Sequence, residues 1–219
     1  MDWELLAQNR QLLLSGLRIT VEVSACALVL AFVLGTVIAT LRVAPNRLLR
    51  TIGTAYVEFV RNVPLLVQIF FFYFGLPSIG IRFGAFECGF LGLGIYTAAF
   101  IAETIRGGIL SVHRGQMEAA LASGMSHAKA MRLVILPQAF RAVIPPLGNQ
   151  VLNLIKNSAL VSTIAVYDIL HTADSIGAQT FAYSTVYTAA ALLYLCLTLP
   201  SAYVVNQLER RFKTAAVSV

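Results

Sequence analysis

Three adjacent polar residues, Lys156, Asn157 and Ser158, interrupt an apolar stretch in the second half of the chain. A charged side chain in the middle of a membrane span is costly, and lysine reaches the interface poorly from that depth. We therefore expect Lys156 to face a polar cavity or an acidic partner. An ammonium, an amide and a hydroxyl group together can donate hydrogen bonds to a carboxylate. The set predicts a polar site that accepts an anionic ligand.

A second group of charged residues also lies within apolar segments. Glu58 and Arg61 are three positions apart, so they share a helix face and could neutralise each other. Glu103 should lie at a similar depth on another helix and could join them. Two interpretations stay open: a structural charge cluster that holds spans together or meets a partner, and a gate along the substrate pathway.

The elements that position these residues are membrane spans. Of the 219 residues, 58% are hydrophobic and 12% are charged, against about 25% charged in a soluble domain. A bilayer core needs about 20 apolar residues of helix. Five segments meet that length, so we expect an all-α integral membrane protein with five transmembrane helices, forming a single domain over residues 1–219. The expected spans are approximately Thr20–Leu41, Thr54–Phe74, Phe90–Ile109, Leu147–Val166 and Val186–Val205.

The loops between these spans alternate in charge. Lys and Arg concentrate in cytoplasmic loops, which places the N-terminus outside and the C-terminus in the cytoplasm. The N-terminal segment carries acidic residues and lacks the basic start of a cleaved signal, so we expect the first span to be retained. The basic residues on the expected cytoplasmic side are Arg42, Arg47, Arg50, Arg106, Arg114, Lys129, Arg132, Arg141, Arg210, Arg211 and Lys213.

Several kinds of site are not expected. The three cysteines, Cys26, Cys88 and Cys196, are far apart and suggest neither a disulfide framework nor a metal site. The chain lacks the His-Glu-x-x-His and Gly-x-Ser-x-Gly motifs, and it has no Gly-x-x-x-x-Gly-Lys-Ser/Thr phosphate loop. We therefore expect neither an intramembrane enzyme nor an ATPase.

The loop at about residues 113–137 is neither apolar enough to span nor disordered in composition. Gln116–Gly124 predicts a short helix of good helix formers that ends at Gly124. Ser126 can cap a second short helix, with Pro137 near its end. Two such helices form a projection that could dock a soluble partner. The alternative is a helix pair that lies on the lipid surface.

The residue pattern of this loop resembles the signature loop of ABC-importer permeases. That signature is Glu-Ala-Ala, three residues, Gly, nine residues, Ile, one residue, Leu and Pro, and the only departure here is Val134 for Ile. The resemblance implies a type I permease fold in which coupling helices contact an ATP-hydrolysing subunit. It implies transmission through Glu118 and Gly124 and close packing at Ala119 and Ala120. The matching residues are Glu118, Ala119, Ala120, Gly124, Leu136 and Pro137.

Three further stretches, Tyr56–Gln68, Ala102–Ile109 and Asn153–Val161, resemble permeases for polar amino acids. Many relatives have Asp where this chain has Asn157, and an Asp would favour cationic substrates. The Lys156–Asn157 pair is most similar to one subunit of glutamate/aspartate importers. The resemblance therefore implies import of glutamate or aspartate, with neutral or basic polar amino acids (glutamine, asparagine, histidine, arginine) as the alternative.

The resemblance also implies partners. ATP and Mg would be bound by separate ATP-binding cassette subunits, and no cofactor is expected in this chain. A second permease, identical or related, should complete the pathway, and an extracytoplasmic binding protein should deliver the amino acid. The expected location is the bacterial inner membrane. A channel or secondary carrier that works without ATP is the alternative from a different class.

Overall fold

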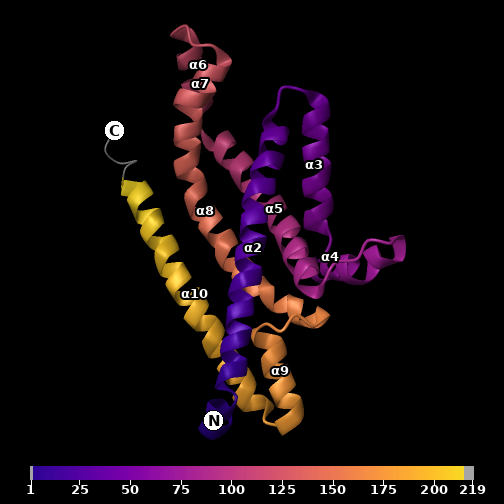
Figure 1. Ribbon diagram of the computed structural model, residues 1–219. Coiled ribbons are helices and arrows are strands. Elements are labelled where there is room, and N and C mark those ends of the chain that lie inside the picture. The colour runs from indigo at the N-terminus through magenta and orange to yellow at the C-terminus, as the bar shows by residue number, and fades with distance from the viewer. Residues whose placement is uncertain (1, 215–219) are drawn as a thin grey trace.

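The computed structural model describes residues 2–214, which form helices and connecting segments without a strand (Figure 1). The π-helical turns are η1 and η3, and the 3₁₀ segments are η2 and η4. The elements are α1 (Trp3–Gln8), α2 (Arg10–Val43), α3 (Arg47–Asn62), α4 (Leu65–Phe70), η1 (Phe71–Gly75), η2 (Leu76–Ile79), α5 (Ala85–Ser111), α6 (Arg114–Ala122), α7 (His127–Ala130), η3 (Met131–Ile135), α8 (Leu136–Asn157), η4 (Ser158–Ile164), α9 (Ile169–Thr180) and α10 (Tyr183–Thr214).

Four helices of the described chain are long and apolar enough to cross a membrane: α2, α5, the continuous helix His127–Ile164, and α10. A fifth candidate span consists of α3 together with the segment from α4 to η2, which bend by 102° at their junction. The expected second span, Thr54–Phe74, corresponds to this bent pair, with Pro64 at the break. Pro64 has no backbone N–H and drives Val63 into an extended conformation (φ −99°, ψ 128°), so the helix ends at Asn62.

The segment around Pro137 also differs from the expectation. Ser126 caps α7 as expected, by accepting a hydrogen bond from the Lys129 N–H. The helix does not end near Pro137, however, but continues through η3 into α8 as one helix of 38 residues. The π-helical turn η3 directly precedes Pro137, whose ring nitrogen cannot donate to the preceding turn. The local irregularity accommodates the proline without stopping the helix.

Helix α9 was not expected from the sequence, which suggested a loop between the fourth and fifth spans. Asp168 caps its N-terminus by accepting a hydrogen bond from the His171 N–H. Ile169, Ala173 and Ile176 are buried and share one helix face. They pack with Leu13 of α2 and with α10, so α9 closes the end of the bundle where the chain begins (Figure 1).

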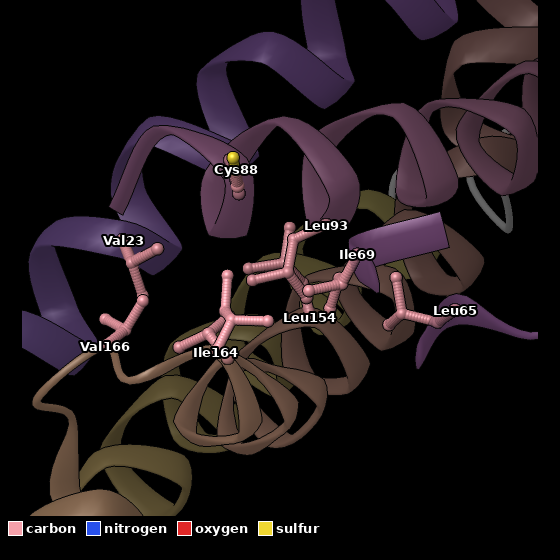
Figure 2. Close-up of a cluster of buried hydrophobic side chains, with 10 residues drawn as sticks. Val23, Leu65, Ile69, Cys88, Leu93, Leu154, Ile164 and Val166 are labelled. Carbon is pink, nitrogen blue, oxygen red and sulfur yellow. The ribbon is translucent and has the colours of Figure 1, made fainter. Parts of the chain in front are cut away.

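The core lies where α2 and α5 cross and where the bent second span and η4 meet them. Figure 2 shows Val23, Ile69, Leu93, Leu154 and neighbouring side chains directed toward one another from these elements. Close approach depends on small residues, because a Cβ on Gly94 would lie 2.7 Å from Leu30 Cδ2. This core fixes the relative positions of the polar residues.

Candidate functional site: the coupling hairpin and the polar groups of the spans

The segment from α6 to η3, here called the coupling hairpin, projects from one end of the bundle (Figure 1). The His113 ring accepts a hydrogen bond from the Gly115 N–H (3.1 Å) and caps α6. The helix ends as expected at Gly124, whose φ of +82° suits glycine. The Met125 N–H donates to the Ala120 carbonyl (3.1 Å), which completes the helix stop.

The hairpin buries few residues of its own. Ala120, Ala130 and Ile135 are buried where α6 packs against η3. Ala120 is thus buried within the hairpin and Ala119 is exposed, and the expected close packing at these two alanines stays a prediction. Glu118, Gly124, Leu136 and Pro137 are exposed as well, and Leu121 and Leu133 add apolar surface. The motif residues thus form an accessible surface rather than a core.

The three expected members of the charge cluster do not form one set of ion pairs, although Glu58 interacts electrostatically with Arg106, a partner of Glu103. Glu103 pairs with Arg42 of α2 and with Arg106 of its own helix (2.5 Å between Arg106 Nη2 and Glu103 Oε1). Arg61 instead stacks over the Phe100 ring at 5.1 Å, and Glu58 is exposed. Among the ion pairs of the described residues, none joins Glu58 to Arg61. The expected mutual neutralisation is therefore wrong, and Arg42 was missed as a partner.

Lys156 lies on the outer side of α8, beside an open hollow of about 430 Å³ that α10 shares. Its side chain is exposed, and none of the ion pairs of the described residues includes it. Tyr194 and Thr198 line the same hollow near the middle of α10. The wall of this hollow is largely apolar, with Ala159, Ala191 and Leu195 beside these two hydroxyl groups, so the expected polar cavity or acidic partner stays a prediction.

Asn157 and Ser158 are less exposed than Lys156. Asn157 is half-buried at the end of α8, and Ser158 is fully buried at the start of η4. The Ser158 hydroxyl donates to the Ile155 carbonyl (2.7 Å). Ser158 thus serves the backbone where the α-helix tightens into a 3₁₀ turn, and its hydroxyl also interacts with Tyr194, which lines the Lys156 hollow. The expectation that these three residues offer one set of donors stays a prediction.

A buried polar group at the α9 end was not expected from the sequence. The Asp168 carboxylate is 0% exposed and accepts hydrogen bonds from the His171 N–H (2.9 Å) and the Tyr194 hydroxyl (3.0 Å). Thr20 of α2 accepts from the Ile169 N–H (3.1 Å). Burial raises the pKa of the Asp168 carboxyl, and these donors oppose that shift. An Asp directly before a periodic apolar segment was the available signal.

Comparisons with known proteins agree with this arrangement. The chain is 47% identical over 213 residues to the probable glutamine ABC transporter permease GlnM of Bacillus subtilis (strain 168), covering 97% of this chain and 99% of that protein. It is 38% identical over 212 residues to the glutamate/aspartate import permease GltJ of Escherichia coli (strain K12), covering 91% and 86%.

Solved structures show the same architecture. The crystal structure of an amino acid ABC transporter with histidines superposes with a TM-score of 0.92 at 36% identity, covering 96% of this chain and 99% of that one. The inward-facing MetNI methionine ABC transporter has a TM-score of 0.78 at 20% identity, which supports the fold alone.

Residues 31–214 match the family described as binding-protein-dependent transport system inner membrane component. Such permeases are transport components, and the ATPase activity of their systems resides in a separate subunit. The type I permease fold, the accessible signature loop and the extensive similarity to ABC permeases lead to one conclusion. The chain belongs to the family of ABC-transporter permeases that form the inner-membrane component of binding-protein-dependent transport systems.

Proposed function

We propose that this permease imports polar amino acids, with glutamate and aspartate as cargo, by alternating access driven by ATP hydrolysis on partner subunits. Support for amino acids comes from the relatives, whose names include glutamine and glutamate/aspartate permeases. The observation that carries the acidic cargo is Lys156, a cation beside a hollow at the middle of α10 and outside the ion pairs of the described residues.

The coupling hairpin is the proposed contact for the ATP-binding cassette subunits, which would bind ATP and Mg. Its exposed Glu118, Ala119 and Gly124 and its apolar Leu121 and Leu136 offer a mixed surface for a protein groove. A second permease, identical or related, would cover the hollow that contains Lys156, and an extracytoplasmic binding protein would deliver the substrate.

The proposed orientation places the hairpin in the cytoplasm and the α9 end outside. The hairpin, the α2–α3 connection and the carboxyl end of α10 lie at one end of the bundle, and the amino terminus lies at the other (Figure 1). The basic loops therefore share one end, which supports a cytoplasmic C-terminus and an external N-terminus in the inner membrane.

Glutamine is the second candidate cargo, because the relative with 47% identity is a probable glutamine permease. Both amino acids carry an α-carboxylate that Lys156 could attract, but only glutamate and aspartate add a second negative charge. The two candidates therefore differ in how strongly uptake should depend on the charge at this position.

Uptake of labelled glutamate and glutamine by liposomes that contain the transporter, its ATPase subunit and its binding protein tests this proposal. Lys156→Met should lower glutamate uptake by at least tenfold and glutamine uptake less, because an anion in a poorly solvated pathway loses its counter-charge. Lys156→Arg should restore part of the glutamate uptake. Removal of ATP should abolish uptake of both.

Arg82→Gln is the matched control, since it removes an exposed positive charge from the connection between η2 and α5, far from Lys156 along the chain. It should leave both uptake rates near wild type. Unchanged glutamate uptake by Lys156→Met would refute the acidic cargo. If the wild-type transporter takes up glutamine but not glutamate, glutamine is the cargo. Uptake without the ATPase subunit would refute ATP-driven import.

A further inference from the structure

A second hollow lies between α2, α3 and α5 at the hairpin end of the bundle. Its volume is about 520 Å³, within the range of small-ligand sites. It forms where the end of α2 and the first turns of α3 face Arg106 of α5. Its lining residues are Arg42, Arg47, Arg50, Thr51, Thr54, Ala55 and Arg106.

The hollow has an excess of positive charge. Four arginines line it. Glu103 pairs with Arg42 and Arg106, and Glu58 interacts with Arg106 electrostatically at longer range. Arg47 and Arg50 are exposed and take part in none of the ion pairs of the described residues. Two positive charges therefore remain after both carboxylates are counted, which favours an anionic ligand.

Arg42 shows that the polar groups of this site are incompletely satisfied. Its side chain is only 7% exposed, and one of its terminal nitrogens donates to Glu103. Its buried Nε has no hydrogen-bond partner. An unsatisfied buried donor is unfavourable, and it is rare in a charged side chain. A ligand with several acceptor oxygens would accept hydrogen bonds from this guanidinium and from the neighbouring exposed Thr54 hydroxyl.

The surface beside the arginines is apolar. Leu48 and Ile52 of α3 are 67% and 50% exposed, and Leu49 is also exposed. Leu48 and Ile52 directly follow Arg47 and Thr51 in the sequence, and Leu49 directly precedes Arg50, so all three lie beside the lining residues on the same helix. A ligand that joins a phosphate to acyl chains would match both surfaces, whereas a free anion would use the arginines alone.

We propose that this arginine hollow binds the phosphate group of an anionic phospholipid, whose acyl chains lie along Leu48, Leu49 and Ile52. The lipid would link α2, α3 and α5 where the second span begins. The proposal goes beyond amino-acid transport and does not depend on which amino acid is carried. It requires only that this end of the bundle lies at the depth of lipid headgroups.

The test measures lipid binding to the purified, delipidated transporter complex by native mass spectrometry. Phosphatidylglycerol should bind more tightly than phosphatidylcholine. The double variant Arg47→Gln/Arg50→Gln should bind phosphatidylglycerol about thirtyfold more weakly, because an arginine near an anionic headgroup contributes about 1 kcal/mol. Each single variant should lose about fivefold. Both arginines are exposed, so these variants should fold.

Arg82→Gln is again the matched control and should bind phosphatidylglycerol like wild type. Equal affinity of wild type and double variant for phosphatidylglycerol would overturn the proposal, as would equal affinity of the wild type for the two lipids. An excess of inorganic phosphate identifies the source of the anion. If phosphate alone raises the melting temperature of wild type but not of the double variant, and displaces the lipid, the site takes a soluble phosphate and the lipid assignment is wrong.

Discussion

The two ends of the bundle are built in opposite ways. At the α9 end, Asp168, Thr20 and Tyr194 join α9, α2 and α10 through buried hydrogen bonds. At the hairpin end, the conspicuous residues are exposed, and Ala120 and Ala130 provide a small internal contact. Buried polar networks fix a single arrangement, whereas an accessible helix pair can be held by a partner. The difference predicts that hydrogen bonds within this chain hold the α9 end, whereas a partner holds the hairpin end.

The largest effect on stability is expected at the α9 end. Asp168→Ala removes the helix cap and leaves the Tyr194 hydroxyl without its acceptor, at a cost of about 2–4 kcal/mol. The melting temperature in detergent measures this. Asp174→Ala, which removes an exposed carboxylate of the same helix and its solvent-exposed hydrogen bond from the Tyr187 hydroxyl, is the control for the buried network. Equal melting temperatures for the two variants would show that the buried network does not stabilise this end.

The pH dependence of the stability contributed by Asp168 gives a second measurement of the same buried group. Burial raises the pKa of Asp168 above its value in the unfolded chain. The folded state therefore binds the proton more readily, so this group contributes stability at low pH and loses it as pH rises through its folded pKa. Asp168→Asn keeps a capping oxygen and should lack this dependence. Its stability relative to wild type should therefore increase with rising pH.

Two glycines allow a smaller comparison between the ends. A Cβ on Gly16 would lie 2.7 Å from Thr172 Oγ1 and 2.9 Å from the Asp168 carbonyl oxygen, so Gly16→Ala should cost about 1–3 kcal/mol through overpacking. A Cβ on Gly124 would meet nothing within 4 Å, but its φ of +82° is unfavourable for alanine. Gly124→Ala should cost about 1 kcal/mol.

Asparagine variants distinguish overpacking at Gly16 from the backbone conformation at Gly124, and the melting temperature measures the difference. Asn tolerates the left-handed conformation, so Gly124→Asn should recover most of the stability that alanine loses. Gly16→Asn should be worse than Gly16→Ala, because the larger side chain meets the same neighbours. A recovery at Gly16 would contradict the overpacking explanation.

The long apolar helices could be predicted from the sequence because hydropathy is a local property. The runs that became α2, α5 and α10 are apolar regardless of what they contact. The extended conformation before Pro64 also follows from a local rule. The 102° bend does not, because its direction and size depend on the packing of Leu65 and Ile69 in the core (Figure 2).

The side-chain partners likewise divide into those that follow from local sequence and those that depend on how the helices pack. Glu58 and Arg61 satisfied a local spacing rule, yet Arg61 stacks on Phe100 and Glu103 pairs with Arg42, which is 61 positions away. Long-range pairing depends on how α2 and α5 cross. Ser158 was placed beside Lys156 by sequence, but the change from α-helix to 3₁₀ turn buries it. By contrast, Gly124 could be assigned as a helix stop because the required backbone conformation is local.

The smallest effect on stability is expected at Glu118, together with a large effect on function. Its side chain is exposed, so Glu118→Gln should change the free energy of unfolding by less than about 0.5 kcal/mol. If the hairpin is the contact for the ATPase, the variant should lose most of the transport that ATP hydrolysis drives. Substrate uptake and ATP hydrolysis, measured together in liposomes, test this.

Glu4→Gln is the matched control, because it removes an exposed carboxylate at the opposite end of the bundle (Figure 1). It should leave uptake, hydrolysis and stability near wild type. A loss of stability at Glu118 would mean that the hairpin is held by contacts within this chain. Wild-type uptake by Glu118→Gln would mean that this carboxylate does not couple ATP hydrolysis to transport. The contrast between an α9 end held within this chain and a hairpin end held by a partner would then have to rest on other residues of the hairpin surface.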